Sequence, residues 1–207
     1  MLYARNSLIL SSLSAALAAL LGLFIAYGVR LSGNWILLAA ARFASIGYAI
    51  PGAVLAVGVI TPLSRADTAL NNFTESIFGI STGLLLSGTI IAITYGYLVR
   101  FLALSYGTAE SGLSKITSNM DGAARTLGLS PTKTLIRVHF PILKGSILTA
   151  AILVFVDTMK ELPMTLLLRP FNYGTLATHV HQFASDELLE ESALGALAIV
   201  AAGILPV

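Results

Sequence analysis

Three long stretches without a charged residue constrain this chain more than any other feature. Residues 6–29, 43–64 and 76–99 contain no Asp, Glu, Lys or Arg, and charged residues bound each stretch. A helix rises about 1.5 Å per residue, so roughly 20 apolar residues cross the hydrocarbon core of a bilayer. The runs therefore predict three spanning helices. The first is longer than the apolar core of a signal peptide, about 7 to 15 residues, so we expect it to remain as a helix.

Two further apolar runs lie in the second half of the chain. Residues 145–156 form a run of only twelve uncharged residues. We expect this helix to continue to about residue 168, because twelve residues are too few to cross a bilayer. A fifth run begins at Ser192 and is still apolar at Val207. The expected fold is an all-α membrane bundle of about five spanning helices, with residues 1–207 as one domain that is a fragment of a longer protein.

Composition supports a membrane protein and excludes several other classes. The chain is 56% hydrophobic and 11% charged, with a mean hydropathy of +0.86, whereas soluble domains carry roughly 25% charge. We therefore expect membrane lipid to surround the chain. The net charge of +2 is too small to indicate nucleic acid as a partner. The chain has no cysteine, which excludes disulfides and thiolate metal sites, and we expect neither a cofactor nor a bound metal.

The distribution of Lys and Arg predicts the orientation of the chain. Residues 111–144 contain five Lys or Arg residues and one acid, Asp121. We call residues 111–141 of this stretch the basic island and expect them to form one cytoplasmic loop within the domain. Short loops rich in Lys and Arg face the cytoplasm, so the island is expected there. Counting helices from it places residues 30–42 inside, and residues 65–75 and 169–191 outside.

The basic island has the local signals of two short helices. Residues 111–127 favour a helix, and Gly128 stands where a left-handed residue ends one. Ser130 followed by Pro131 predicts the start of a second helix, because the hydroxyl caps it and proline suits its first position. We expect Pro141 to interrupt this second helix.

Small residues and a proline recur at fixed spacing along the island. Two adjacent alanines are followed by three residues of any type and then by glycine. Nine further residues of any type separate this glycine from an aliphatic residue, which is followed by a variable residue, an apolar residue and proline. The residues that match are Ala123, Ala124, Gly128, Val138, Phe140 and Pro141. This pattern resembles the cytoplasmic loop of inner-membrane permeases of binding-protein-dependent ABC importers, where the loop forms a coupling helix seated on the ATPase subunit.

The resemblance implies roles for particular residues of the island. Docking to the ATPase would involve Asp121, Gly122, Ala123, Ala124, Arg125, Gly128 and Pro141. Members of the family usually have Glu at the position of Gly122, so an acidic contact would be absent here or supplied by Asp121. ATP hydrolysis would reside in the separate ATPase subunit, and this chain would not be an enzyme.

Other segments resemble the ferric-iron branch of these permeases. They are residues 47–56, 97–103 and 157–170, with a less specific match at 175–180. The resemblance implies one half of a two-domain permease, with a second permease domain and a periplasmic substrate-binding protein as partners. Import of thiamine, sulfate, polyamine or phosphonate remains an alternative. So do a secondary transporter, which needs ionisable residues near the midplane, and an anchoring subunit.

Ionisable residues in the fourth span are candidates for a translocation pathway. Charged side chains inside a bilayer are costly and usually face a protein interior or a water-filled path, which points to Asp157, Lys160 and Glu161. Asp157 and Lys160 are three residues apart and can pair on one helix face. Pro163 would bend the helix. The alternative is that the helix ends near Thr158 and these charges are solvated.

Two other patterns have a structural and a functional interpretation. Pro51 and Gly52 indicate either a functional kink or close packing against a neighbouring helix, and we favour packing. His179 and His181 admit a metal site, but packed or solvated side chains are the more common case. For His139 we likewise favour packing over a ligand role.

Overall fold

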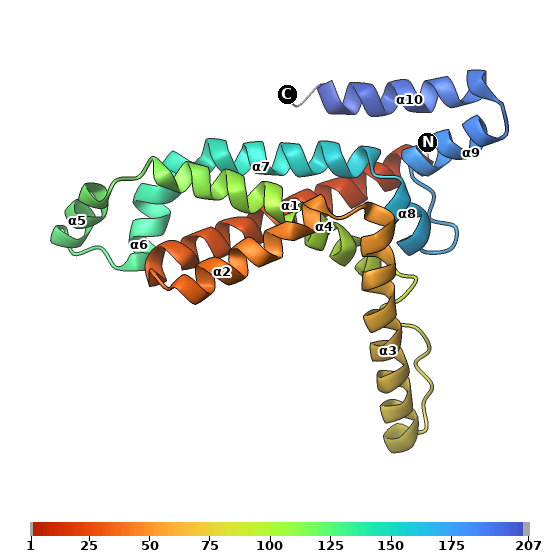
Figure 1. The fold of residues 1–207 in the computed structure, drawn as a ribbon, viewed down its shortest axis with the longest axis horizontal. Coiled ribbons are helices and arrows are strands. Elements are labelled where there is room, and N and C mark those ends of the chain that lie inside the picture. The colour runs from red at the N-terminus through yellow and green to blue at the C-terminus, as the bar shows by residue number, and fades with distance from the viewer. Residues whose placement is uncertain (1, 205–207) are drawn as a thin grey trace.

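Residues 2–204 are described by a computed structural model, and all regular secondary structure among them is helical, as predicted. Helices α1 (Leu2–Ser32), α4 (Ile90–Ser114) and α7 (Phe140–Lys160) lie side by side as the central bundle (Figure 1). Within these residues, four helices are long and apolar enough to cross a membrane. They are Leu2–Ser32, Gly52–Phe78, Ile90–Ser114 and Pro131–Lys160.

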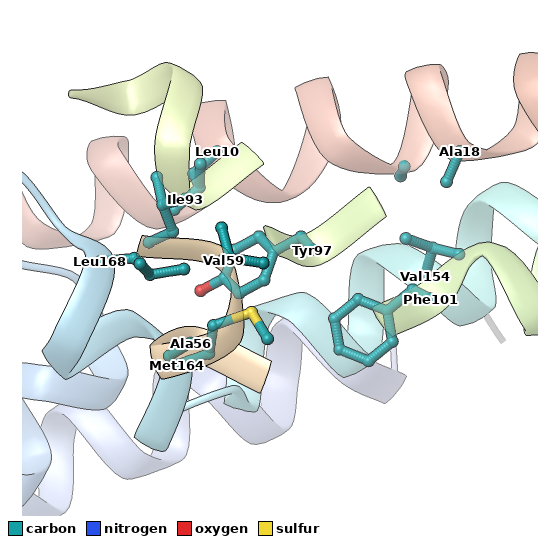
Figure 2. Packing of buried hydrophobic residues seen from close by; sticks show 11 residues of the cluster. Leu10, Ala18, Ala56, Val59, Ile93, Tyr97, Phe101, Val154, Met164 and Leu168 are labelled. Atoms are coloured by element: carbon teal, nitrogen blue, oxygen red, sulfur yellow. The ribbon is translucent and has the colours of Figure 1, made fainter. Parts of the chain in front are cut away.

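The bundle core combines small residues of α1 with larger side chains of its neighbours. Ala18 of α1 is fully buried and belongs to one core cluster with Tyr97 and Phe101 of α4 and Val154 of α7 (Figure 2). A Cβ atom on Gly22 of α1 would lie 2.6 Å from a backbone carbon of α4. Close approach of backbones at small residues is the usual way in which helices associate in membranes.

The second charge-free run does not form one helix, contrary to expectation. Its first part belongs to α2 (Trp35–Ala44) and the 3₁₀ turn η1 (Ser45–Ala49), and α3 (Gly52–Phe78) begins after Pro51. Pro51 lacks an N–H group and takes an extended conformation, so the helix cannot continue through it. Figure 1 shows α3 turning away from the bundle. The expected loop at residues 65–75 is part of α3.

The third run was predicted as a helix over residues 76–99, but residues 79–89 are not helical. Gly79, Gly83 and Gly88 all have positive φ. The Asp67 carboxylate of α3, 1% exposed, accepts the backbone N–H groups of residues 85, 86 and 87 at 2.7–3.0 Å. Asn71 Oδ1 accepts those of residues 82 and 83. These side chains replace the hydrogen bonds that a helix would supply, and α4 then runs past residue 99 to Ser114.

The fourth span gains its length at the opposite end from the one predicted. It begins with α6 (Pro131–Thr134), passes through a π-helical turn, η2 (Leu135–His139), and continues as α7 to Lys160. Pro141 therefore does not interrupt the helix. The backbone N–H of Phe140 bonds to the carbonyl of Leu135, five residues back. The widened turn accommodates the proline ring, which would clash in a regular helix.

The remaining helices lie at the two ends of the bundle. Helix α5 (Ser118–Thr126) and α6 lie at one end, and α8 (Pro163–Leu168) and α9 (Leu176–Ser185) at the other (Figure 1). Helix α10 (Leu189–Ile204) includes the start of the fifth apolar run and packs mainly on α9.

Candidate coupling site and helix breaks

Two turns isolate α5 from the long helices on either side. The predicted helix over residues 111–127 is divided, since α4 ends at Ser114 and α5 begins at Ser118. Gly128 has φ +74°, and its N–H bonds to the Arg125 carbonyl at 2.9 Å while the next N–H bonds to Ala124. This left-handed helix end was predicted. The predicted cap is also present, because Ser130 Oγ accepts the N–H of Lys133.

Asp121 is directed into the protein. One carboxylate oxygen accepts a hydrogen bond from Arg30 Nη2 at 2.7 Å, and the other accepts one from His139 Nε2 at 2.7 Å. Burial acts to raise the pKa of the Asp121 carboxyl, but the hydrogen bonds from Arg30 and His139 outweigh it and hold that pKa below its ordinary value of 3.8. Both oxygens are therefore occupied within this chain.

The other residues of the motif differ in exposure: most have exposed side chains or backbone, and one is buried against the bundle. Gly122, Ala123, Arg125 and Gly128 are exposed, and a Cβ on Gly122 would meet nothing within 4 Å. Ala124 is only 3% exposed, so it contacts the bundle. Pro141 is exposed but belongs to the first turn of α7.

Sequence reasoning missed two residues of α1 that complete this site. Arg30 also donates to the carbonyls of Leu113 and Ile116, at 2.9 and 3.0 Å, where α4 ends. The Tyr27 hydroxyl donates to the carbonyl of Pro131 at 3.2 Å, and its ring packs edge-on against the ring of His139. The one signal in the sequence was the position of Arg30 at the end of an apolar run. Such a position is common in membrane proteins and does not by itself indicate a site. His139, with a side chain 2% exposed, is packed as favoured.

A second polar cluster joins two helix breaks near the other end of the bundle. Arg100 of α4 bonds to the carbonyl of Ile50 at 2.7 Å and lies 3.4 Å from the carboxylate of Glu161. Glu161 ends α7 and accepts the N–H of Met164 in α8 at 3.3 Å. A Cβ on Gly52 would overlap Glu161. Gly52 is thus closely packed, as favoured, whereas Pro51 separates η1 from α3. Arg100 lies well inside α4.

The remaining pathway candidates do not join this cluster. Asp157 and Lys160 form the predicted pair, at 2.8 Å, and Asp157 accepts a hydrogen bond from the hydroxyl of Tyr48 at 3.2 Å. Lys160 is 63% exposed. Pro163 is the first residue of α8, so it lies at a helix start and does not bend α7. The structure thus divides the four candidates into the buried carboxylate of Glu161, a pair of an exposed Lys160 and a half-buried Asp157, and a proline that starts a helix.

The histidines of α9 have aromatic neighbours. The ring of His179 stacks on Tyr3 and meets Phe183 edge-on, with both centroid distances 4.5 Å, while His181 is exposed. Among residues 2–204, no three His, Asp or Glu side chains are grouped as metal ligands.

Comparisons with known proteins address the fold and the family. Residues 18–207 match the family of the binding-protein-dependent transport system inner membrane component. The structure resembles a chain of the methionine ABC transporter MetNI in an inward-facing conformation, with a TM-score of 0.69 and 16% sequence identity. The match covers 98% of this chain and 90% of that one. At this identity the likeness concerns the fold.

Two curated relatives are named for the transport of different substrates. The chain is 24% identical over 202 residues to the Fe(3+)-transport system permease protein FbpB 2 of Haemophilus influenzae, covering 98% of this chain and 37% of that protein. It is 22% identical over 157 residues to the putative 2-aminoethylphosphonate transport system permease protein PhnV of Salmonella typhimurium, covering 76% and 53%. The chain therefore spans less than two thirds of either relative. It belongs to the family of binding-protein-dependent transport system inner membrane components, multi-pass permeases that are not themselves the ATPase.

Proposed function

We propose that this chain is a permease domain of an ATP-driven importer and that α5 is its coupling helix. The observation that carries the proposal is the geometry of α5, a short helix held at one end of the bundle with small residues facing outward. In this function an ATPase subunit binds α5, and its nucleotide-driven movements shift the spanning helices between inward-open and outward-open states. A second permease domain completes the pathway.

The docking face consists of Gly122 and Ala123 of α5 together with Leu127 and Gly128, which follow at its C-terminal end. Leu127 is 79% exposed, and the glycines and alanine beside it allow another backbone to approach closely. An exposed apolar side chain surrounded by small residues is typical of a position that a partner covers. Arg125, also exposed, supplies a charge beside this face. Asp121 and Ala124 support the face from within.

The pair of Asp157, half-buried, and Lys160, exposed, remains our candidate for the translocation pathway. Its position beside Tyr48 places a carboxylate, an ammonium group and a phenol together near the break between η1 and α3. Polar groups at interrupted helices are the usual sites of solute passage in membrane transporters. Glu161 and Pro163 would contribute by fixing the start of α8.

Ferric iron is the substrate that we propose, and an aminoethylphosphonate is the alternative. Support for iron comes from the name of the first relative and from the local resemblance of residues 47–56, 97–103 and 157–170. Support for the alternative comes from the similarly distant phosphonate permease. Substrate selection would reside mainly in a periplasmic binding protein that delivers the substrate to the outer end of the bundle.

The docking proposal is tested by placing bulk on the docking face. Gly122→Leu adds a side chain where the isolated chain has open space, so folding is unaffected while ATPase binding is blocked. Gly145→Leu is the matched control, since Gly145 is also a helical glycine with nothing within 4 Å of its Cβ position. Gly128 is a poorer choice because its φ of +74° makes any substitution strained.

The assay measures copurification of the ATPase from membranes and uptake of labelled ferric iron in cells that carry the complete transporter. We expect both to be lost in Gly122→Leu and retained in Gly145→Leu. Normal copurification and uptake in Gly122→Leu would refute docking on this face. Uptake of aminoethylphosphonate in place of iron would reject the iron assignment and leave the permease function standing.

A further inference from the structure

We propose that Asp121 is a positioning residue that makes α5 move as one body with α1, α4 and α7. The inference rests on the proposed function, because it assigns a role in transmitting the movement of the ATPase. We call the group formed by Tyr27, Arg30, Asp121 and His139 the coupling node.

The coupling node joins every helix around the island. Asp121 belongs to α5, Tyr27 and Arg30 to α1, and His139 to the π turn that leads into α7. Arg30 also bonds to the carbonyl of Leu113 in the last turn of α4 and to that of Ile116 just beyond it. A displacement of α5 therefore acts on three long helices through one carboxylate.

Helix α5 has few other polar connections to the bundle. Within residues 2–204, the two hydrogen bonds at Asp121 are the only ones that a side chain of α5 makes to another helix. The helix is nine residues long and lies between two turns, so its orientation depends on side-chain contacts. The apolar contact of Ala124 is nondirectional and does not fix rotation about the helix axis.

The burial of the coupling node makes its bonds directional and strong. The exposed fractions of the side chains are 27% for Asp121, 22% for Arg30 and 2% for His139. Charge-assisted hydrogen bonds are short and strongly oriented, and partial burial limits their screening by water and salt. A cavity of about 130 Å³ lined by Arg30, Arg125 and Thr134 adjoins the node. We infer that the polar contacts, and not tight packing, hold α5 in place there.

Asp121→Asn is the direct test, because asparagine keeps the size of the side chain and removes its charge. The chain has no cysteine, so a spin label at Asn119→Cys, exposed on α5, reports the mobility of this helix in the assembled transporter. We expect greater label mobility and unchanged ATPase copurification. We expect iron uptake per ATP hydrolysed to fall about tenfold, a common size for a coupling between sites. Asp121→Glu should restore part of the uptake.

A second pair of variants keeps the test decisive if Asp121→Asn does not accumulate in membranes. Arg30→Gln removes the other charge of the node, and Arg42→Gln is its matched control. Arg42 pairs with Glu110 at 3.1 Å near the same end of the bundle, and its side chain is 65% exposed. Arg30→Gln should reproduce the uncoupled phenotype and Arg42→Gln should behave as wild type.

The outcomes separate this proposal from the proposed function. Unchanged mobility and unchanged uptake per ATP in Asp121→Asn would overturn the positioning role. Loss of ATPase copurification in Asp121→Asn would overturn it as well, because Asp121 would then act at the docking face. If the wild-type chain itself copurifies with no ATPase, the proposed function fails, whereas the label mobility still reports whether Asp121 holds α5.

Discussion

Replacing Gly22 by alanine should separate α1 from α4. Gly22 lies where a Cβ atom would be 2.6 Å from the backbone carbon of Ser105 and 2.7 Å from the backbone nitrogen of Tyr106. Backbone atoms cannot rotate away as a flexible side chain can. Restoring an ordinary contact of 3.4 Å requires the helices to move apart locally by about 0.8 Å, a gap that forfeits roughly a quarter to a half of each dispersion contact.

Gly28→Ala in the same helix provides the reference for this effect. A Cβ on Gly28 meets only a Leu37 methyl group at 3.9 Å. Both variants gain about 1 kcal/mol of helix propensity, so the difference between them isolates the steric cost. Overpacking typically costs about 1 to 3 kcal/mol, and we expect Gly22→Ala to be less stable than Gly28→Ala by that amount.

The difference is measured by reversible unfolding in mixed detergent micelles, followed by circular dichroism. Two equally stable variants would refute the reasoning, because they would show that α1 and α4 have room for a methyl group. A loss in Gly28→Ala as large as in Gly22→Ala would also contradict it, since the effect would then not depend on the contact with Ser105.

Three further predictions concern polar contacts. Asp67→Asn replaces an acceptor by a donor facing backbone N–H groups, so hydrogen exchange at residues 85–87 should accelerate at least about tenfold, while exchange in α1 is unchanged. Glu161→Gln leaves Arg100 without its charged partner and should cost about 3 kcal/mol. In a double-mutant cycle, replacing both Glu161 and Arg100 by methionine should recover most of the lost free energy of unfolding. If the losses of the two single variants simply added in the double variant, the pairing would be disproved. The pKa of Asp121 is lowered by Arg30, so its bonds stabilise the fold above the pKa of the unfolded state and are lost as pH falls through the lower folded pKa. The mobility of a spin label at residue 119 should therefore stay constant from pH 8 to pH 5 and increase only below about pH 4. A change between pH 7 and 5 would contradict this.

The sequence predicted the helices whose stability depends on their own residues. Helix α1 matches its charge-free run because an unbroken apolar segment has one satisfactory structure in a membrane. Gly128, Ser130 and Pro131 were assigned correctly because caps depend on neighbours within a few residues.

The failures occurred where a distant side chain supplies the hydrogen bonds. Residues 79–89 belong to a charge-free run long enough to span, but the carboxylate of Asp67, on another element, accepts the N–H groups of residues 85–87. Likewise, Asp121 was recognised as part of a motif, but its partner Arg30 lies 91 residues away in sequence. Local patterns carry no information about a pairing between such distant residues. Because the pairing with Arg30 could not be foreseen, Asp121 was expected to be available for contact with the ATPase.

The π turn at Leu135–His139 joins α6 to the membrane-spanning part of the same helix. A π turn contains one more residue than an α turn and accommodates it by widening, so the helical segments on its two sides keep nearly the same rotation about the helix axis. Deleting one residue from this turn would restore regular winding and remove the extra room beside Pro141, while the direction in which α5 and α6 leave α7 would change little. The extra residue thus alters the backbone locally without rotating the docking face relative to the membrane-spanning part of the helix.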